Sequence, residues 1–236
     1  MKKITVLLIC AFLSVGLNAQ SFIGAWESYH TSENGDTLKS VVIFGDGYQV
    51  IATYDLKTGQ FIRTEGGTWK LAGDTMTETV EFDSKYPDKV GKEVSFKVFI
   101  NDSIMGIVGW DREYKRIDNG EPGKLHGAWL FSGRVKDGKT QMRDTSGPRK
   151  TMKILSGTRF QWIAYNTETK QFMGTGGGTY TTTNGEYTEN IEFFSRDDSR
   201  VGASLKFDYS LADGNWHHSG RSSKGEPIHE IWSKRE

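Results

Sequence analysis

Residues 61–82 read FIRTEGGTWKLAGDTMTETVEF, and residues 172–193 read FMGTGGGTYTTTNGEYTENIEF. The two stretches lie 111 positions apart and share a Gly-Gly-Thr-aromatic run, a turn containing glycine, and a segment that ends in Glu-Phe. Segments that alternate between polar and apolar residues are typical of strands with one buried face, and a glycine turn between two of them predicts a hairpin. We therefore interpret each stretch as two antiparallel strands of an all-β protein.

The similarity between the two halves extends well beyond this hairpin. Matched positions run without a gap over residues 54–96 and 165–207, and a Gly-Ala-Trp motif occurs at residues 24–26 and 127–129. Each copy has about 100 residues, which exceeds the roughly 20–50 residues of a solenoid repeat and is long enough for a core of its own. The chain is therefore predicted to be a tandem duplication of a small domain.

Turn signals separate short alternating segments in both copies and define the expected strands. In the second copy about eight strands are expected, near residues 126–134, 149–156, 159–166, 171–182, 185–195, 201–210, 215–222 and 228–234. The first copy repeats this order with a shorter last hairpin, near residues 103–117. Eight sequential antiparallel strands close most economically into an up-and-down barrel, which removes exposed edges and leaves room for side chains or one small ligand. A sandwich is the alternative, but it usually needs a longer crossover than any found here. The boundary falls between Lys115 and Lys124, so the expected barrels are residues 20–120 and 121–236.

The N-terminus has the pattern of an export signal over residues 1–19. Lys2 and Lys3 precede a nearly all-apolar stretch, and Ala19 offers a small residue for cleavage. The single cysteine, Cys10, follows an isoleucine inside that stretch, which disfavours a lipoprotein. We expect an exported, periplasmic or extracellular protein that is soluble after cleavage. The apolar stretch is shorter than a spanning helix, so no membrane span is expected.

Composition excludes several classes of function. The chain has 30 basic and 30 acidic residues, and removal of the signal with its two lysines leaves a small negative charge. Nucleic acids and anionic membrane surfaces both favour a basic excess, so neither is expected as a partner. Without a cysteine after the signal, disulfides, thiolate catalysis and cysteine metal sites are excluded. No nucleophile elbow, zinc-protease motif or phosphate loop is present, so we expect neither an enzyme nor a cofactor.

The ends of each copy share a pattern. Gly-Ala-Trp opens each first strand, and each last strand has an aromatic residue close to a basic one: Tyr114 and Arg116 in the first copy, Trp232 with Lys234 and Arg235 in the second. This pattern resembles that of the calycins, the group that includes lipocalins and fatty-acid-binding proteins. The resemblance implies that the first-strand tryptophan packs under a basic side chain and closes the barrel base. The expected closure pairs are Trp26 with Arg116, and Trp129 with Lys234 or Arg235.

A second resemblance points to lipocalin-like proteins secreted by Gram-negative bacteria, which have no established activity. It rests on the Gly-Gly-Thr-Tyr run at residues 177–180 and the Tyr-x-Glu-x-Ile-Glu-Phe strand at residues 187–193. It implies a fold and leaves the function open.

Two repeated glutamates, Glu78 and Glu189, are the most informative polar residues. Each shares strand phase with an apolar pair that ends in Phe82 or Phe193, so each is expected to face a barrel interior. A buried carboxylate needs a partner. The partner could be the headgroup of a ligand or a cation, but buried charges are usually satisfied by neighbouring side chains. Glu81 and Glu192 lie on the opposite face and are expected to be solvated.

If a ligand site exists, the sequence favours the second barrel. That copy has eight extra residues before Tyr165, within a basic segment from Arg134 to Lys150 that could cover a barrel mouth and favour an anionic ligand. It also has more aromatic residues, although a filled core would look the same. The candidate ligand-binding residues are Glu189, Trp162, Tyr209, Phe193, Phe207 and Tyr180.

Three histidines flank the last hairpin. His217 and His229 would lie on one face within diagonal reach, and a one-residue shift in register would place His218 there instead. Because three suitably spaced ligands are not evident, no metal site is assigned.

The leading hypothesis is a secreted, non-catalytic protein that binds a small apolar or amphiphilic ligand. The alternative is an interaction module with filled barrels that binds a protein or glycan, and the sequence does not identify a protein partner. An enzyme comes third.

Overall fold

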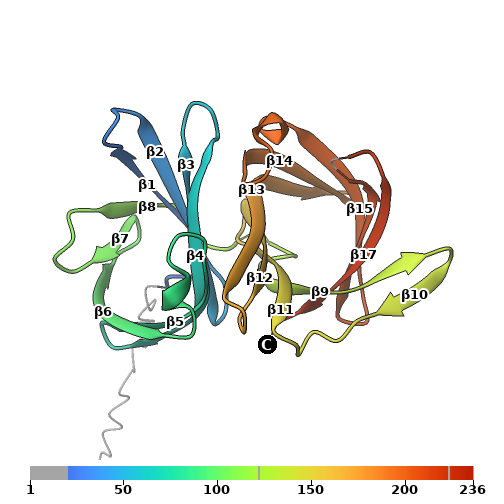
Figure 1. The fold of residues 1–236 in the computed structure, drawn as a ribbon, viewed down its shortest axis with the longest axis horizontal. Helices are drawn as coiled ribbons and strands as arrows, with labels where there is room; N and C mark the ends of the chain where they lie inside the picture. Colours follow the sequence, from blue (N-terminus) through green and yellow to red (C-terminus); the bar gives the residue numbers. More distant parts are fainter. Residues whose placement is uncertain (1–20, 122, 223, 236) are drawn as a thin grey trace, which may run out of the picture.

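The computed structural model describes residues 21–121, 123–222 and 224–235. The expected signal at residues 1–19, with Cys10, lies outside the described residues. Within them, strands β1 to β17 form two antiparallel barrels that lie side by side (Figure 1). The predicted fold class of two tandem up-and-down barrels is confirmed.

The first barrel is a simple meander. Its strands are β1 (Gly24–Thr31), β2 (Thr37–Phe44), β3 (Tyr48–Asp55), β4 (Phe61–Ala72), β5 (Thr75–Asp83), β6 (Glu93–Ile100), β7 (Ile104–Ile107) and β8 (Glu113–Asp118). Each strand pairs with the next, and β8 pairs with β1 to close the barrel. A short 3-10 helix, η1 (Pro87–Lys89), connects β5 to β6.

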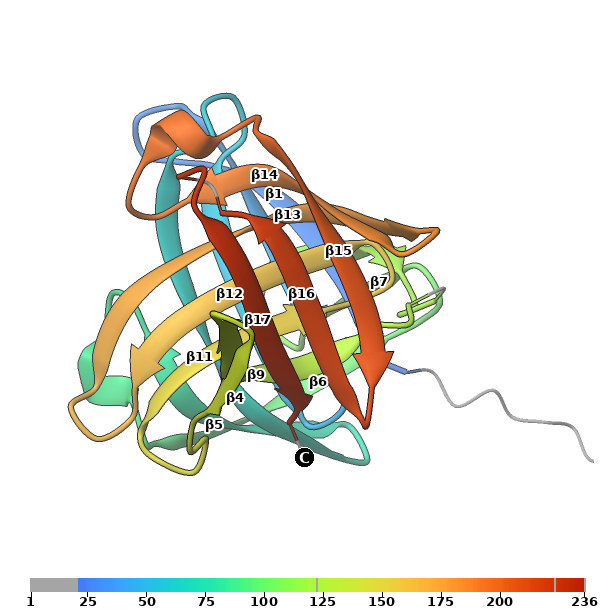
Figure 2. The same cartoon turned by 90° about the vertical axis from the view of Figure 1, so that its right-hand side faces the viewer.

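The second barrel repeats this plan with one addition. Its strands are β9 (Gly127–Lys136), β10 (Lys139–Met142), β11 (Arg149–Leu155), β12 (Arg159–Asn166), β13 (Gln171–Thr183), β14 (Glu186–Phe194), β15 (Ser204–Ala212), β16 (Asn215–Arg221) and β17 (Pro227–Lys234). The 3-10 helix η2 (Asp198–Arg200) connects β14 to β15. Strands β15, β16 and β17 run side by side across the barrel (Figure 2), and β17 pairs with β9 to close it.

The addition is β10, which pairs with the outer end of β9 and projects as a hairpin from the side of the barrel (Figure 1). It lies within the basic segment that was expected to be a loop. Its four residues are exposed, so no alternation of buried side chains marks it in the sequence. None of the described helices is long and apolar enough to cross a membrane.

A β-bulge in each copy follows from the repeated Gly-Gly pair. Gly66 pairs with Phe82 whereas Gly67 pairs with Val80, which leaves Glu81 as an extra residue in β5. A side chain on Gly67 would overlap the carbonyl oxygen of Thr79, so this close crossing of strands requires glycine. A bulge shifts the alternation of a strand by one residue. The same geometry recurs in β13 and β14, where Glu192 is the extra residue.

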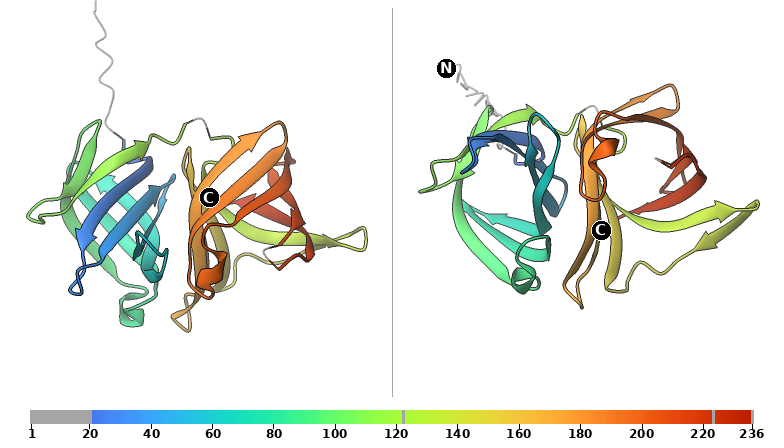
Figure 3. Two further views of the ribbon diagram at one scale, coloured as in Figure 1. Left: turned by 90° about the horizontal axis from the view of Figure 1, so that it is seen from above. Right: turned by 45° about the horizontal axis from the view of Figure 1, so that its top comes forward.

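The bulges direct Phe82 and Phe193 out of their barrels and into the interface between them. Phe193 stacks on Tyr54 at a ring separation of 4.8 Å, and Phe82 packs against Tyr165 at 4.8 Å. One buried apolar cluster therefore contains side chains of both barrels, which lie flank to flank in both views of Figure 3. Members from the two barrels include Val41, Ile43, Val50, Ala52, Met152, Ile154 and Ile163.

The prediction that Glu81 and Glu192 are solvated is wrong. The Tyr54 hydroxyl donates to Glu192 at 2.5 Å, and Arg159 donates to both oxygens of the same carboxylate at 2.6 and 2.7 Å. In the mirrored arrangement the Tyr165 hydroxyl donates to Glu81 at 2.5 Å. Arg235 donates to both oxygens of Glu81 at 2.7 and 2.8 Å. Each copy thus contributes its glutamate to a Tyr-Glu-Arg cluster that joins the two barrels.

Candidate functional site

Both first-strand tryptophans are buried beneath a cation of their own barrel. The Arg116 guanidinium lies 3.9 Å from the centre of the Trp26 ring, and the Lys234 ammonium lies 4.9 Å from the centre of the Trp129 ring. The indole N–H groups of the two tryptophans donate to backbone carbonyls four residues earlier. Arg235 does not take this place: it lies over Tyr48 and pairs with Glu81 across the interface. Successive residues of a strand point to opposite faces, so only one of Lys234 and Arg235 can face Trp129.

The interior of the second barrel holds a buried ion pair. The Lys153 ammonium donates to Glu189 at 2.6 Å, and each residue is 5% exposed. Three aromatic rings surround the same ammonium, with centres 5.0 to 5.3 Å away. They belong to Tyr187, Trp216 and Trp232. Such a cage stabilises a cation through the negative faces of its rings, and the carboxylate neutralises the charge.

Further large side chains pack around this ion pair. His218 is 2% exposed and lies 4.1 Å from Phe207, measured between ring centres. Burial and the Lys153 ammonium lower the pKa of His218, which favours the neutral imidazole. The Tyr180 hydroxyl donates to the carbonyl of Ser156 at 2.6 Å. The interior of this barrel is therefore occupied by its own side chains.

The residues proposed to bind a ligand consequently belong to packed structure. Glu189, Tyr180 and Phe207 are buried, and Trp162 and Tyr209 pack against the same cluster. Phe193 lies at the interface between the barrels, because the bulge reverses its direction. For Glu189 the structure supports the simpler interpretation of an internal partner.

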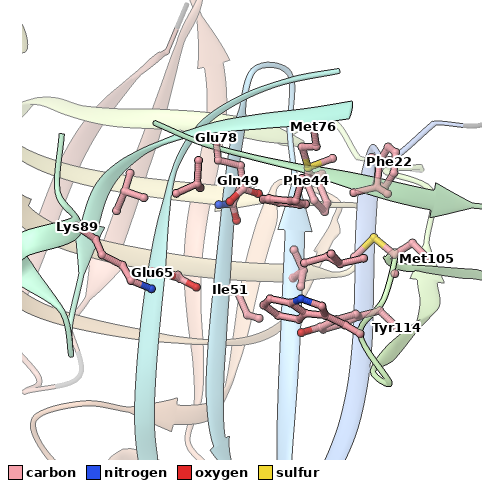
Figure 4. A pocket seen from close by; sticks show the side chains of 18 residues that line it. Phe22, Phe44, Gln49, Ile51, Glu65, Met76, Glu78, Lys89, Met105 and Tyr114 are labelled. Atoms are coloured by element: carbon pink, nitrogen blue, oxygen red, sulfur yellow. The ribbon is translucent and has the colours of Figure 1, made fainter. Parts of the chain in front are cut away.

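The first barrel, in contrast, contains an apolar cavity of about 310 Å³. Apolar side chains from five strands and from the segment before β1 form most of its wall: Phe22, Val42, Phe44, Ile51, Met76, Val94, Phe96, Val98 and Met105. Figure 4 shows Lys89, Glu65, Glu78 and Gln49 gathered at one end, whereas Phe22, Phe44 and Met105 lie at the other. The cavity is thus amphiphilic, with one polar end and one apolar end.

The internal repeat explains why this barrel is hollow. Strand pairing keeps the 111-residue offset: Val42 pairs with Ile51, as Lys153 pairs with Trp162. Five large fillers of the second barrel have smaller counterparts in the cavity wall. Lys153, Tyr187, Trp216, Trp162 and Phe160 correspond to Val42, Met76, Met105, Ile51 and Gln49. Replacing four aromatic side chains and a lysine by smaller side chains leaves the space open.

Glu78 corresponds to Glu189 but has no lysine beside it, since Val42 stands at the position of Lys153. Glu78 makes no hydrogen bond or ion pair with any other described residue. Burial, together with the nearby Glu65 carboxylate, raises the pKa of Glu78 from 4.5 to about 7. The cavity therefore presents an unsatisfied carboxyl group to whatever enters it.

The other charged groups at the polar end are already paired. Glu65 accepts from Arg63 at 2.6 Å, and Arg63 also reaches Asp83 at 2.8 Å. The Lys89 ammonium faces Glu65 and lies 5.0 Å from the centre of the Tyr86 ring. Glu78 is distinguished from these groups by having no partner.

The remaining candidate features lie on the outside of the second barrel. The basic β9–β10 hairpin is solvated, and its Arg134 donates to Gln141 at 3.0 Å. His217 and His229 lie in the predicted diagonal contact, with ring nitrogens 3.3 Å apart. Among the described residues no group of three or more His, Asp, Glu or Cys side chains is placed to hold a metal ion.

Residues 124–236 match a protein family described only as a domain of unknown function (DUF4488). The match covers strands β9 to β17, and that description gives no activity, substrate or partner. A comparison with curated proteins gives no match.

Sequence reasoning identified Glu78 but favoured the second barrel for a ligand, whereas the apolar cavity lies in the first barrel. The cavity wall could have been found by comparing the two copies position by position at the interior sites. A high aromatic content is compatible with a lined pocket or with a filled core, and in this molecule the barrel with more aromatic residues is the filled one.

Proposed function

We propose that the protein is a non-catalytic binding protein, exported by the segment at residues 1–19, whose first barrel holds a small apolar or amphiphilic ligand. The supporting observation is the amphiphilic cavity of about 310 Å³ in that barrel. Ligand pockets are typically apolar concavities with few polar groups, which matches this wall. The resemblance to lipocalin-like proteins agrees with a barrel that holds one small ligand.

Because one barrel is filled and the other is hollow, we assign different roles to the two copies. The second barrel buries a satisfied ion pair and contributes half of the apolar interface. Its role in this proposal is to support the first barrel and to present the β9–β10 hairpin to solvent. Binding of a protein or glycan by that hairpin is the second candidate function, favoured by its projection from the barrel.

Titration with the neutral fluorescent probe N-phenyl-1-naphthylamine tests the proposal. The mature chain is expected to bind the probe, with a blue shift and an increase in emission. The double variant Met76→Tyr and Met105→Trp copies the second barrel's side chains into the cavity and should abolish binding. Leu71→Trp adds similar bulk at an exposed position of β4 and serves as the matched control. Equal binding by the wild type and the filled variant would refute the proposal.

A further inference from the structure

We propose that the ligand of the first barrel carries a protonated amine, which forms an ion pair with Glu78 while an apolar tail fills the rest of the cavity. This inference rests on the proposed function and specifies its ligand class. The ligand is then a cationic amphiphile, such as a primary alkylamine or an amine with an aromatic or aliphatic body.

The second barrel provides the internal precedent. There the glutamate at the matching position, on β14, is satisfied by a primary ammonium at 2.6 Å, which Lys153 supplies from β11 across the barrel interior. In the first barrel the glutamate remains, but the matching strand position carries Val42, which has neither charge nor donor. The first copy therefore has the carboxylate without the ammonium that pairs with it in the second copy. A ligand ammonium would restore the arrangement that the second barrel completes with its own side chain.

The shape and lining of the cavity constrain the apolar part of the ligand. Glu78 lies at the polar end, and Phe44, Met76 and Met105 line the space that extends away from it (Figure 4). Methionine side chains adapt to ligands of different shape, and they stand where the second barrel has rigid rings. A flexible tail of about eight carbons, or a compact ring system, suits such a wall.

A carboxylate ligand fits this end less well. Its charge would lie beside Glu78 and Glu65. Lys89, the one cation among the described residues that line the cavity, already faces Glu65 and the Tyr86 ring. Like charges in a poorly solvated site repel each other strongly. An amine, in contrast, gains a charge-assisted hydrogen bond to a group that otherwise has no partner.

The amine preference should depend on pH. The titratable groups that line the cavity around Glu78 are Glu65 on β4, Lys89 on η1 and Tyr114 on β8. The pKa of Glu78 is about 7. Burial also raises the pKa of Glu65, although its ion pair with Arg63 and the nearby Lys89 oppose that rise. An alkylamine stays protonated from pH 5 to pH 8, since its pKa is close to that of lysine. Protonation of Glu78 below neutrality therefore removes the attraction without changing the ligand.

The test compares octylamine, 1-octanol and octanoate as competitors of N-phenyl-1-naphthylamine on the full mature chain. At pH 8 octylamine should bind about tenfold more tightly than 1-octanol, and octanoate more weakly than both. In Glu78→Gln the ratio of octylamine to 1-octanol affinity should fall close to one. Glu93→Gln removes an exposed carboxylate from the same barrel and should leave the ratio at its wild-type value.

A second measurement needs no variant. In the wild type the same ratio should fall as the pH is lowered from 8 to 5, with the change centred near neutrality. If 1-octanol binds but octylamine binds no more tightly at any pH, the amine inference is wrong and the proposed function stands. Tighter binding of octanoate than of octylamine would also overturn the inference, in favour of Lys89 as the anchor. If neither the probe nor 1-octanol binds, the proposed function itself fails.

Discussion

At the scale of single residues, the two equivalent glutamates show how one side chain can have opposite roles. Glu189 is satisfied within its barrel by Lys153 and belongs to the packed interior. Glu78 has no such partner and lines a cavity. The strand pattern predicted that both carboxylates face inwards. It could not predict that only one is satisfied, because the pairing depends on a position three strands away in the barrel, which carries lysine in one copy and valine in the other.

The unpaired Glu78 should make the stability of the protein depend on pH. Its pKa is raised from 4.5 to about 7, so the folded protein binds this proton more tightly than the unfolded chain. The corresponding stability is complete below about pH 4.5 and is lost as the pH rises through about 7. The Glu78→Gln variant has no titratable group at this position. It should match the wild type near pH 4 and be about 2–4 kcal/mol more stable at pH 8.

Thermal melts of both proteins from pH 4 to pH 8.5 would measure this difference. Glu93→Gln, which alters an exposed carboxylate, should follow the wild type throughout. A constant difference between wild type and Glu78→Gln across the whole range would contradict the assignment.

At the scale of strands and turns, the sequence indicated where the strands lie. It did not indicate where a bulge reverses the faces to which successive side chains point. The eight expected strands of the second copy correspond to β9 and β11 to β17, most of them within two residues at each end. The bulges were missed, because an extra residue in a strand leaves no mark in the alternation apart from the glycine pair opposite it. That omission placed Phe193 inside the barrel and Glu192 in solvent, whereas both lie in the interface.

The glycine pair opposite each bulge should tolerate no side chain. In Gly178→Ala the new methyl group would overlap the carbonyl oxygen of Asn190 on the paired strand. Overpacking of this kind costs about 1–3 kcal/mol. Gly147 has open space around its Cβ position and no positive φ, so Gly147→Ala should change stability little. Denaturant unfolding of the two variants would compare them, and similar midpoints would contradict the role assigned to Gly178.

At the scale of the whole molecule, the two barrels form one packed unit. The duplication predicted two similar domains, but it could not predict their contact. The interface is built from residues on the outer faces of the strands. In an isolated barrel these faces would be exposed to solvent. The apolar cluster and the two Tyr-Glu-Arg clusters lie along the flanks by which the barrels adjoin.

The Glu192 cluster should make this interface sensitive to acid. Burial raises the pKa of Glu192, but Arg159 and Tyr54 outweigh that effect and lower the pKa to about 2. The stability gained from this carboxylate is therefore present above about pH 4.5 and is lost as the pH falls through about 2. Glu192→Gln should be about 1–3 kcal/mol less stable than the wild type at pH 7 and should approach it at pH 2.

The exposed carboxylate of Glu186 on the same strand offers the matched control. Glu186→Gln removes a surface ion pair with Lys206, so no measurable loss is expected. Thermal melts at pH 7 and pH 2 would show the contrast. Equal stability of Glu192→Gln and the wild type at pH 7 would contradict a stabilising interface cluster.

The central claim, that the first barrel and not the second receives a ligand, can be measured directly through the methionine methyl groups. Met76 and Met105 line the cavity, whereas Met152 is buried in the cluster between the barrels and Met142 lies on the projecting hairpin. Methyl NMR spectra of the mature chain labelled with [¹³C-methyl]methionine would be recorded during titration with 1-octanol. The account predicts saturable shifts of the Met76 and Met105 signals with little change at Met142 and Met152. Unchanged Met76 and Met105 signals at saturating 1-octanol would contradict it.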